Sequence, residues 1–300
     1  MPSPSHTVDN LPPRCPSGLY VVATPIGNLA DITLRAIDTL GGVDLIAAED
    51  TRHTMRLLAR YNIQTPLVSC HEHNESQRTP ELIAKIRAGA AVALVSDAGT
   101  PSVSDPGYRL VCAALAQGLA VFPIPGVSAA LTALCAAGLP TDAFVFVGFA
   151  PKKKGPRTRL LESLAAQPRT LVFYESPHRI AAFIGEVLAV MGDRPAVVAR
   201  EMTKLHEEFV RGTLADLQAS LTQRSPVKGE CTLLVGGAPA TVPISDAQLE
   251  RVLREALVGG DGHLSTLSQS IAQRYHLPRK RVYEMALTIR KAERQNGRCR

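Results

Sequence analysis

Short apolar runs rich in β-branched residues alternate with helical patterns along the first half of the chain, and this alternation restricts the fold most strongly. Such an order is typical of a sheet of mostly parallel strands covered by helices. The apolar runs lie at 19–24, 43–48, 91–96 and 120–124, and the helical patterns at 32–40, 51–60, 80–88, 106–117 and 127–137. We therefore predict a parallel-rich α/β sheet in this half.

A second α/β series begins near residue 143. Its strands are predicted at 143–148, 169–174, 195–200, 206–212 and 231–236, and its helices at 157–166, 178–191 and 213–222. No helical pattern separates 195–200 from 206–212, so these two strands are expected to pair antiparallel. Because the two series differ, the sequence predicts two α/β domains, at 18–138 and 139–237.

The two ends of the chain have other compositions. Residues 1–17 are rich in proline and contain no apolar segment, which predicts a disordered leader and no secretory signal. Small residues and proline after Gly237 indicate a linker. Helical patterns at 246–258, 266–275 and 279–291 then predict a small helical domain over 245–300. A helix-turn-helix and a plain three-helix packing domain fit this pattern equally well.

Positive charge is concentrated at the C-terminal end. Residues 274–300 hold nine Arg or Lys and two Glu, a net charge of +7, which leaves −1 for residues 1–273 out of the total of +6. A basic end of this kind is either a solvated terminus or an electrostatic contact for nucleic acid. The concentration of charge favours nucleic acid.

Cysteine usage and hydropathy bear on the compartment. The six cysteines are scattered singly, without a pair at metal-ligand spacing, as expected in a reducing cytosol. The uncharged segment 110–141 is interrupted by glycine and proline into pieces too short to span a bilayer. We therefore expect a cytoplasmic protein without a membrane segment.

Three loops that follow strands of the first series have unusual compositions. They are ATPIGN at 23–28, SDAGTPSVSDPG at 96–107 and PIPGVSAA at 123–130. Parallel strands place such loops at one edge of the sheet, where open α/β sheets bind ligands. The first loop has neither the GxGxxG dinucleotide motif nor the Gly-Lys-Ser/Thr of a phosphate loop. Each loop alone could be a plain turn, and Asp105 could simply begin the next helix. Together the three loops predict a small-molecule site.

With AAEDTRHT at 47–54, VFYESPHR at 172–179 and AREMTKLHEE at 199–208, these loops resemble the tetrapyrrole-methylase superfamily over about residues 18–237. More narrowly, they resemble its branch that methylates the ribose 2′-hydroxyl of a cytidine, cytidine 1402, in the decoding region of 16S ribosomal RNA. Relatives that modify small tetrapyrroles usually carry a first loop of the type GxGPGD. The ATPIGN loop departs from that pattern and fits the RNA branch.

The resemblance implies two α/β domains of tetrapyrrole-methylase type with S-adenosylmethionine in the cleft between them, followed by a small helix-turn-helix-like domain. It also implies a homodimer. Carried over position by position, it implies cofactor contacts in the three loops and at the start of the second domain. These are Pro25, Gly27, Asp97, Ala98, Gly99, Thr100, Ser128, Ala129, Gly148 and Phe149.

Methyl transfer to a ribose makes limited demands on the protein. A sulfonium methyl group is already electrophilic, so the enzyme chiefly positions the attacking oxygen, and no metal is required. The hydroxyl still needs a general base or a cation that stabilises the developing alkoxide. Candidate side chains follow apolar strands at 49–52, 175–179 and 200–204. We predict Glu201 and Lys204 as the catalytic residues, with His178 as another candidate base.

Five cations lie within the eight residues 152–159, at the start of the second domain. A charge run is usually solvated surface, but beside a cofactor cleft we favour contact with RNA phosphates, which would weaken steeply as salt rises. The predicted RNA contacts are Lys152, Lys153, Lys154, Arg157, Arg179, Arg200, Arg279, Lys280 and Arg281. The expected partner is 16S ribosomal RNA or the small ribosomal subunit.

Other functions fit these features less well. A methyltransferase acting on a tetrapyrrole would need an apolar, aromatic-lined pocket, whereas aromatic residues make up only 4% of this chain. A non-catalytic RNA-binding ribosome assembly factor would use the same cations but would not need three shaped loops. A DNA-binding regulator would rest on the helix-turn-helix alone, which is a weak indication of function.

Overall fold

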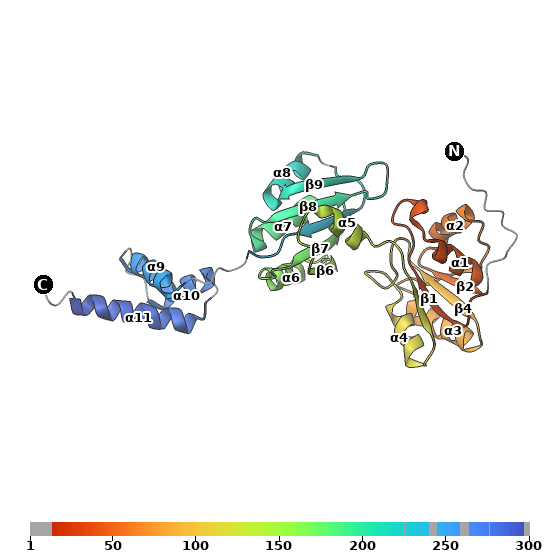
Figure 1. Ribbon diagram of the computed structural model, residues 1–300, viewed down its shortest axis with the longest axis horizontal. Helices are drawn as coiled ribbons and strands as arrows, with labels where there is room; N and C mark the ends of the chain where they lie inside the picture. Colours follow the sequence, from red (N-terminus) through yellow and green to blue (C-terminus); the bar gives the residue numbers. More distant parts are fainter. Residues whose placement is uncertain (1–13, 225, 240–244, 259–263, 276, 297–300) are drawn as a thin grey trace. The chain divides into compact units, whose positions relative to one another are not determined.

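The computed structural model describes residues 14–224, 226–239, 245–258, 264–275 and 277–296, so most of the predicted leader lies outside the described residues. The chain divides into two compact units, Met1–Ala238 and Pro239–Arg300. Figure 1 shows their helices and strands in chain order. No described helix is long and apolar enough to cross a membrane.

The first sheet has five parallel strands in the order β3-β2-β4-β1-β5, which confirms the predicted parallel α/β sheet. Helices α1 (Leu34–Gly42) and α2 (Thr51–Arg60) pack on one face, and α3 (Glu75–Arg87) and α4 (Tyr108–Ala116) on the other. Strands with both faces covered are apolar throughout, as all-parallel sheets require. The strands are β1 (Gly18–Val22), β2 (Leu45–Ala48), β3 (Leu67–Ser69), β4 (Ala91–Val95) and β5 (Val121–Ile124).

Two elements of this sheet differ from the sequence prediction. Strand β3 was not predicted, because three half-buried residues are too few for a pattern to appear. The helix predicted at 80–88 begins at Glu75 and has Pro80 in its interior. The prediction of a start at residue 80 was therefore wrong by five residues. Proline usually lies in the first turn of a helix, which is where a start at 80 would have placed Pro80.

The second sheet is mixed, with the strand order β6-β7-β10-β8-β9. Only β6 and β7 pair in parallel, and the β8–β9 pair is antiparallel, which confirms the predicted pairing. Helices α6 (Lys154–Leu164), α7 (Ile180–Met191) and α8 (Leu214–Gln223) pack on one face. The strands are β6 (Phe144–Phe149), β7 (Thr170–Glu175), β8 (Pro195–Arg200), β9 (Glu208–Thr213) and β10 (Cys231–Val235).

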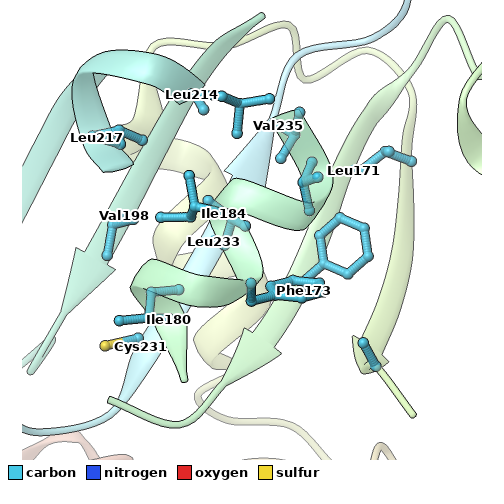
Figure 2. Packing of buried hydrophobic residues seen from close by; sticks show 14 of the residues in the cluster. Leu171, Phe173, Ile180, Ile184, Val198, Leu214, Leu217, Cys231, Leu233 and Val235 are labelled. Atoms are coloured by element: carbon cyan, nitrogen blue, oxygen red, sulfur yellow. The ribbon is translucent and has the colours of Figure 1, made fainter. Parts of the chain in front are cut away.

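A hydrophobic core lies between this sheet and its helices. Figure 2 shows Phe173 and Val198 of the strands close to Ile180 and Ile184 of α7, and all four are nearly inaccessible to solvent. Burying side chains of this size stabilises a domain by about 1.5–3 kcal/mol each. The second sheet therefore has a hydrophobic core of its own.

Helix α5 (Ala129–Ala137) covers the other face of the second sheet. Its buried residues Ala133 and Leu134 belong to the same cluster as Val172 and Leu234 of the sheet and Ile26 of the loop after β1. The boundary at residue 138 thus stays a prediction, since α5 lies before it in sequence and packs on the sheet that follows it.

The second unit is helical, as predicted. Its elements are α9 (Asp246–Val258), α10 (Leu264–Arg274) and α11 (Arg279–Asn296). Leu249 and Leu253 of α9 pack with Ile271 of α10 and with Val282 and Ala286 of α11. Both a helix-turn-helix and a three-helix packing domain remain compatible with these helices.

Candidate active site

The strand order of the first sheet places a ligand site between β1 and β4. These neighbours lead in opposite directions, since β1 continues through α1 to β2 and β4 continues through α4 to β5. Open α/β sheets bind ligands at the carboxyl ends of strands where the order reverses in this way. The two loops meet there, because Thr24 N–H donates to Gly99 O at 2.8 Å and Gly99 N–H donates to Thr24 O at 2.9 Å.

One cavity beside these loops, which we name the acidic pocket, has a volume of about 410 Å³. Its lining, among the described residues, holds five carboxylates and no Lys, Arg or His. The carboxylates are Glu49, Asp97, Asp105, Glu175 and Glu230. No group of three His, Cys, Asp or Glu in the described parts of the chain is placed to hold a metal ion. The lining of the pocket is therefore acidic.

Burial of the acidic pocket makes its negative charge costly. Burial first, and then repulsion from Glu49 and Asp97, raise the pKa of Asp105 to about 6. Burial also raises the pKa of Glu49, although Asp97 N–H donates to the Glu49 carboxylate at 3.3 Å. A bound cation would relieve this repulsion and lower both pKa values.

The loop that carries Asp97 and Asp105 is anchored at its far end by Glu75 of α3. Glu75 is buried, and its Oε1 accepts the N–H groups of Gly107 and Arg109 at 3.0 Å each and of Leu110 at 3.4 Å. These N–H groups belong to the first turn of α4, which has no capping side chain of its own. Glu75 therefore fixes the start of α4 and the shape of the loop before it.

The second sheet supplies the opposite wall of the acidic pocket. Tyr174 Oη accepts the N–H of Ala130, in the first turn of α5, at 3.1 Å, and the Phe149 ring meets the Tyr174 ring edge-on with centroids 5.5 Å apart. Gly148 has a φ of +70°, and a Cβ there would lie 2.6 Å from Ser104 Oγ. Only glycine allows β6 to approach the loop this closely.

A second cavity, which we name the α2 pocket, has a volume of about 480 Å³ and includes residues of helix α2. Its lining contains three groups able to carry positive charge, His53, Arg56 and Lys204. The two pockets share a wall, because Ile26, Asp97, Ala98 and Glu230 line both. The cations of the α2 pocket therefore lie across a shared wall from the carboxylates of the acidic pocket.

Lys204 reaches the α2 pocket from a tight turn after β8. Its Nζ donates to Glu201 Oε1 at 2.8 Å and to Glu230 Oε2 at 3.2 Å. Burial alone would lower the pKa of Lys204, but Glu201 and Glu230 outweigh burial and raise that pKa. A Cβ on Gly27 would lie 2.7 Å from Lys204 Cγ, so the glycine of the first loop leaves room for the lysine.

Glu201 is placed to hold Lys204. It lines neither pocket, its backbone has a φ of 50°, and its carboxylate also accepts the N–H of Glu230 at 3.1 Å. The bond from Lys204 lowers the pKa of Glu201. A carboxylate held in its ionised form is a weak base, so the geometry suits a residue that orients Lys204.

The structure brings most of the predicted cofactor residues to the two pockets. Pro25 and Gly27 line the α2 pocket, and Asp97 and Ala98 line both. Those that line only the acidic pocket are Gly99, Thr100, Ser128, Ala129 and Phe149. Gly148 lines neither pocket, but a Cβ at this position would meet Ser104 Oγ, so the glycine leaves room for the loop that lines the acidic pocket.

Several cations predicted to contact RNA are bound within the protein. Arg157 is the clearest case, because its guanidinium donates to both Glu186 oxygens at 2.6 and 2.7 Å and its side chain is only 12% exposed. Arg179 pairs with Glu175 at 2.9 Å and Arg200 with Glu208 at 2.9 Å.

In the second unit, Arg281 pairs with Asp246 at 2.7 Å, and Arg279 donates to Ser265 Oγ at 2.8 Å. By contrast, Lys152, Lys153 and Lys154 are exposed and form no ion pair with any described residue. The three lysines are therefore the freest of the predicted RNA contacts in the first unit.

The sequence prediction named Glu49 in a candidate segment but assigned no role at the site to His53, Arg56, Tyr174 or Glu230. Asp105 was noticed only as a helix start, yet it lines the acidic pocket and helix α4 begins at Tyr108. The motifs AAEDTRHT and VFYESPHR contain two of these residues, His53 and Tyr174, so the signal was present there. Nothing local marks Glu230, because its position depends on the antiparallel pairing of β10 with β7 and β8.

Proteins with assigned names are similar to this chain over most of its length. A protein of Synechocystis named ribosomal RNA small subunit methyltransferase I is 48% identical over 90% of this chain and 98% of its own length. A protein of the same name from Mesorhizobium japonicum is 51% identical over 78% of this chain and 80% of its own.

Among solved structures, uroporphyrin-III C-methyltransferase from Thermus thermophilus, in complex with S-adenosylhomocysteine, has the same fold. The TM-score is 0.54 at 21% identity, over 73% of this chain and 97% of that one. The model of the tetrapyrrole (corrin/porphyrin) methylases matches residues 18–218. This chain belongs to that family.

Proposed function

We propose that this chain transfers a methyl group from S-adenosylmethionine to the 2′-oxygen of a ribose in 16S ribosomal RNA, at cytidine 1402. The family and the relatives named ribosomal RNA small subunit methyltransferase I support this reaction. The observation that carries it is the pair of pockets on either side of one wall, the first acidic and the second bearing cations.

The acidic pocket fits the proposed cofactor. S-adenosylmethionine carries a sulfonium, an ammonium and a carboxylate group, so its net charge is positive, and when bound it supplies the electrophilic methyl group. Two of the five lining carboxylates are paired, Glu175 with Arg179 and Glu230 with Lys204. The other three leave an acidic lining that attracts such a ligand and repels a nucleotide with several phosphates. The volume of about 410 Å³ lies within the range of cofactor sites. We assign cofactor contacts to Asp97, Gly99, Thr100, Ser128 and Phe149.

Lys204 is the proposed catalytic residue on the RNA side. Its ammonium group lines the α2 pocket beside the shared wall, where it can stabilise the negative charge that develops on the ribose oxygen. As the bond from oxygen to the methyl group forms and the methyl–sulfur bond breaks, the hydroxyl proton would pass to water, because Lys204 already carries its proton and Glu201 is held ionised. Glu201 and Glu230 hold the ammonium group in place. Glu201 thus acts through Lys204. The shared wall brings the ribose close to the acidic pocket, and positioning of this kind supplies much of the rate enhancement.

We propose that Lys152–Lys154 and the basic C-terminal helices contact RNA phosphates. We also propose that the substrate is the small ribosomal subunit and that the protein acts in the cytoplasm. We also propose a homodimer, for which the exposed apolar residues Leu34 and Leu131 are candidate contacts. Light scattering across a concentration series tests the dimer, and a constant monomer mass would contradict it.

Methylation with a labelled cofactor tests the function. The protein is incubated with S-adenosylmethionine labelled in its methyl group and with small ribosomal subunits, free 16S ribosomal RNA or a tetrapyrrole. The proposal predicts label on one ribose of the RNA, found as a nuclease-resistant dinucleotide. Label on a base or on the tetrapyrrole would contradict it. Lys204→Ala should lower the single-turnover rate about a hundredfold with unchanged cofactor affinity.

A further inference from the structure

Helix α2 presents cations along one exposed face. Thr54, Leu57 and Leu58 are buried against the first sheet, at the spacing of one side of a helix. The side turned to solvent holds His53 and Arg56. Both side chains line the α2 pocket, and neither forms an ion pair with any residue in the described parts of the chain.

The first turn of α2 is tied to the shared wall. Asp50 N–H donates to Asp97 Oδ1 at 3.0 Å, and the Asp50 carboxylate caps the helix by accepting the N–H of Arg52 at 2.8 Å. The guanidinium of Arg52 is engaged by the same carboxylate at 2.7 Å. The rigid start of α2 therefore presents His53 and Arg56 to the cavity at a fixed position, while Arg52 is already paired.

The α2 pocket has donors from two parts of the chain. His53 and Arg56 come from the first sheet's helix layer, and Lys204 comes from the turn after β8 in the second half of the unit. Leu29 and Leu57 add apolar surface to the lining. A ligand that fits must combine an anionic group with a less polar body, which describes a nucleotide unit of a nucleic acid. An unpaired guanidinium is well suited to phosphate because its N–H groups match the phosphate oxygens.

We infer that His53 and Arg56 form a phosphodiester subsite for the RNA substrate, next to the ribose that is methylated. The inference rests on the proposed function and adds the residues that position the RNA strand at the reacting centre. The acidic pocket cannot serve this purpose, because its five carboxylates would repel a phosphate. Arg56 therefore contributes to RNA affinity and leaves cofactor affinity unaffected.

The variant Arg56→Gln tests the subsite, with Arg87→Gln as the matched control. Arg87 is the last residue of α3, and neighbouring residues contact the start of β1, since Ser17 Oγ donates to Ile86 O and Gly18 N–H to Ala90 O. It therefore lies at the amino ends of the strands, at the edge opposite the pockets. The affinity for small ribosomal subunits is measured at several salt concentrations, together with methyl transfer and calorimetry with S-adenosylmethionine.

Arg56→Gln should weaken RNA binding about tenfold and reduce the slope of log affinity against log salt by about 0.7 to 1, the value for one lost phosphate contact. The KM for RNA should rise by a similar factor, while the cofactor dissociation constant and the behaviour of Arg87→Gln stay as in the wild type. Wild-type RNA affinity and salt slope in Arg56→Gln would overturn the subsite, as would an equal loss in Arg87→Gln.

The wild-type protein separates this inference from the proposed function. If the wild type methylates ribose and Arg56→Gln does so with an unchanged KM for RNA, only the subsite fails. If the wild type binds no RNA and transfers no methyl group to it, the proposed function fails and the subsite fails with it. His53→Ala provides a second variant at the same cavity and should weaken RNA binding in the same direction.

Discussion

The acidic pocket and the α2 pocket share a wall, yet the charged side chains that line them differ. The acidic pocket has five carboxylates and no cation among its described residues, whereas the α2 pocket adds His53, Arg56 and Lys204 to the two carboxylates of the shared wall. On the proposed function, this difference suits the acidic pocket to the cofactor and the α2 pocket to the RNA strand. Two reactants of opposite charge can then approach each other without competing for the same surface.

The difference has a structural origin. Glu49 and Glu175 stand at the carboxyl ends of β2 and β7, and Asp97 and Asp105 stand in the loop after β4. The cations of the α2 pocket come from a helix face and from a turn after β8. Four of the five carboxylates thus lie at or after the carboxyl ends of strands and Glu230 lies directly before β10, whereas His53 and Arg56 lie on a helix.

Loss of the Glu75 anchor should have the largest effect. Glu75→Ala leaves the N–H groups of Gly107, Arg109 and Leu110 without their acceptor, which should lower the free energy of unfolding by about 3 kcal/mol. Urea denaturation measures this change. Cofactor affinity should fall as well, because the loop of the acidic pocket loses its anchor. Glu81 is an exposed partner of Arg78 on the same helix, so the control Glu81→Ala should change the free energy of unfolding by less than about 0.5 kcal/mol. If Glu81→Ala lowered this free energy as much as Glu75→Ala, the anchoring role of Glu75 would be contradicted.

Placing a cation in the acidic pocket should have the next largest effect. Asp105→Lys reverses the charge of a half-buried group and should weaken S-adenosylmethionine binding by about a hundredfold, since a like charge would face the sulfonium ion. Calorimetry measures the affinity. The control Asp38→Lys, on the exposed face of α1, should bind the cofactor normally. Near-normal binding by Asp105→Lys would show that the pocket does not hold a cation.

The pH dependence of cofactor binding gives a smaller effect. Because the pKa of Asp105 is raised to about 6, its carboxyl group gains a proton as the pH falls through 6, and the pocket then attracts a cation less. S-adenosylmethionine affinity should drop severalfold from pH 7.5 to pH 5. The drop should be smaller for S-adenosylhomocysteine, which has no sulfonium charge, and smaller in Asp105→Asn. Affinity that rises towards low pH would contradict the assignment.

The same carboxyl group affects stability in a defined direction. Between its ordinary pKa of 3.8 and its raised value of about 6, the folded protein binds more of this proton than the unfolded chain. Its contribution to the free energy of unfolding therefore decreases as the pH rises through that window. The bound cofactor should reduce this decrease, which denaturation with and without S-adenosylmethionine would detect.

The cations outside the pockets should have the smallest effects. Replacement of Lys152, Lys153 and Lys154 by Ala should weaken RNA binding only severalfold, and the difference should vanish at high salt. Arg157→Ala should instead lower stability, because its guanidinium is held by Glu186 inside the protein. Filter binding measures the RNA affinity, and denaturation measures the free energy of unfolding. A larger loss of RNA affinity in Arg157→Ala than in the variant without the three lysines would contradict this prediction.

Local patterns were sufficient to predict most of the fold. Strands such as Ala91–Val95 are apolar throughout, and helix α8 carries a capping box between Thr213 and Asp216, so both elements are visible in a short stretch of sequence. Strand β3 depends on pairing with β2 through three residues, and the start of α3 depends on contacts with α4. Neither is encoded by a pattern within its own segment.

The sequence predicted those parts of the site that lie at the carboxyl ends of strands. The loops at 23–28, 96–107 and 123–130 were found because parallel strands deliver their carboxyl ends to one edge. Glu75 and Glu230 reach the site only through tertiary contacts, and no spacing in the sequence reveals them. Arg157 shows the opposite error: a charge run predicts exposed cations, but a carboxylate on α7 binds one of them.

If the two pockets hold the cofactor and the RNA strand, they should bind these ligands independently. The affinities for S-adenosylmethionine and for small ribosomal subunits are measured in the wild type, in Asp105→Asn and in Arg56→Gln under the same conditions. Asp105→Asn should weaken only cofactor binding, and Arg56→Gln should weaken only RNA binding. Equal losses of both affinities in either variant would contradict independent binding.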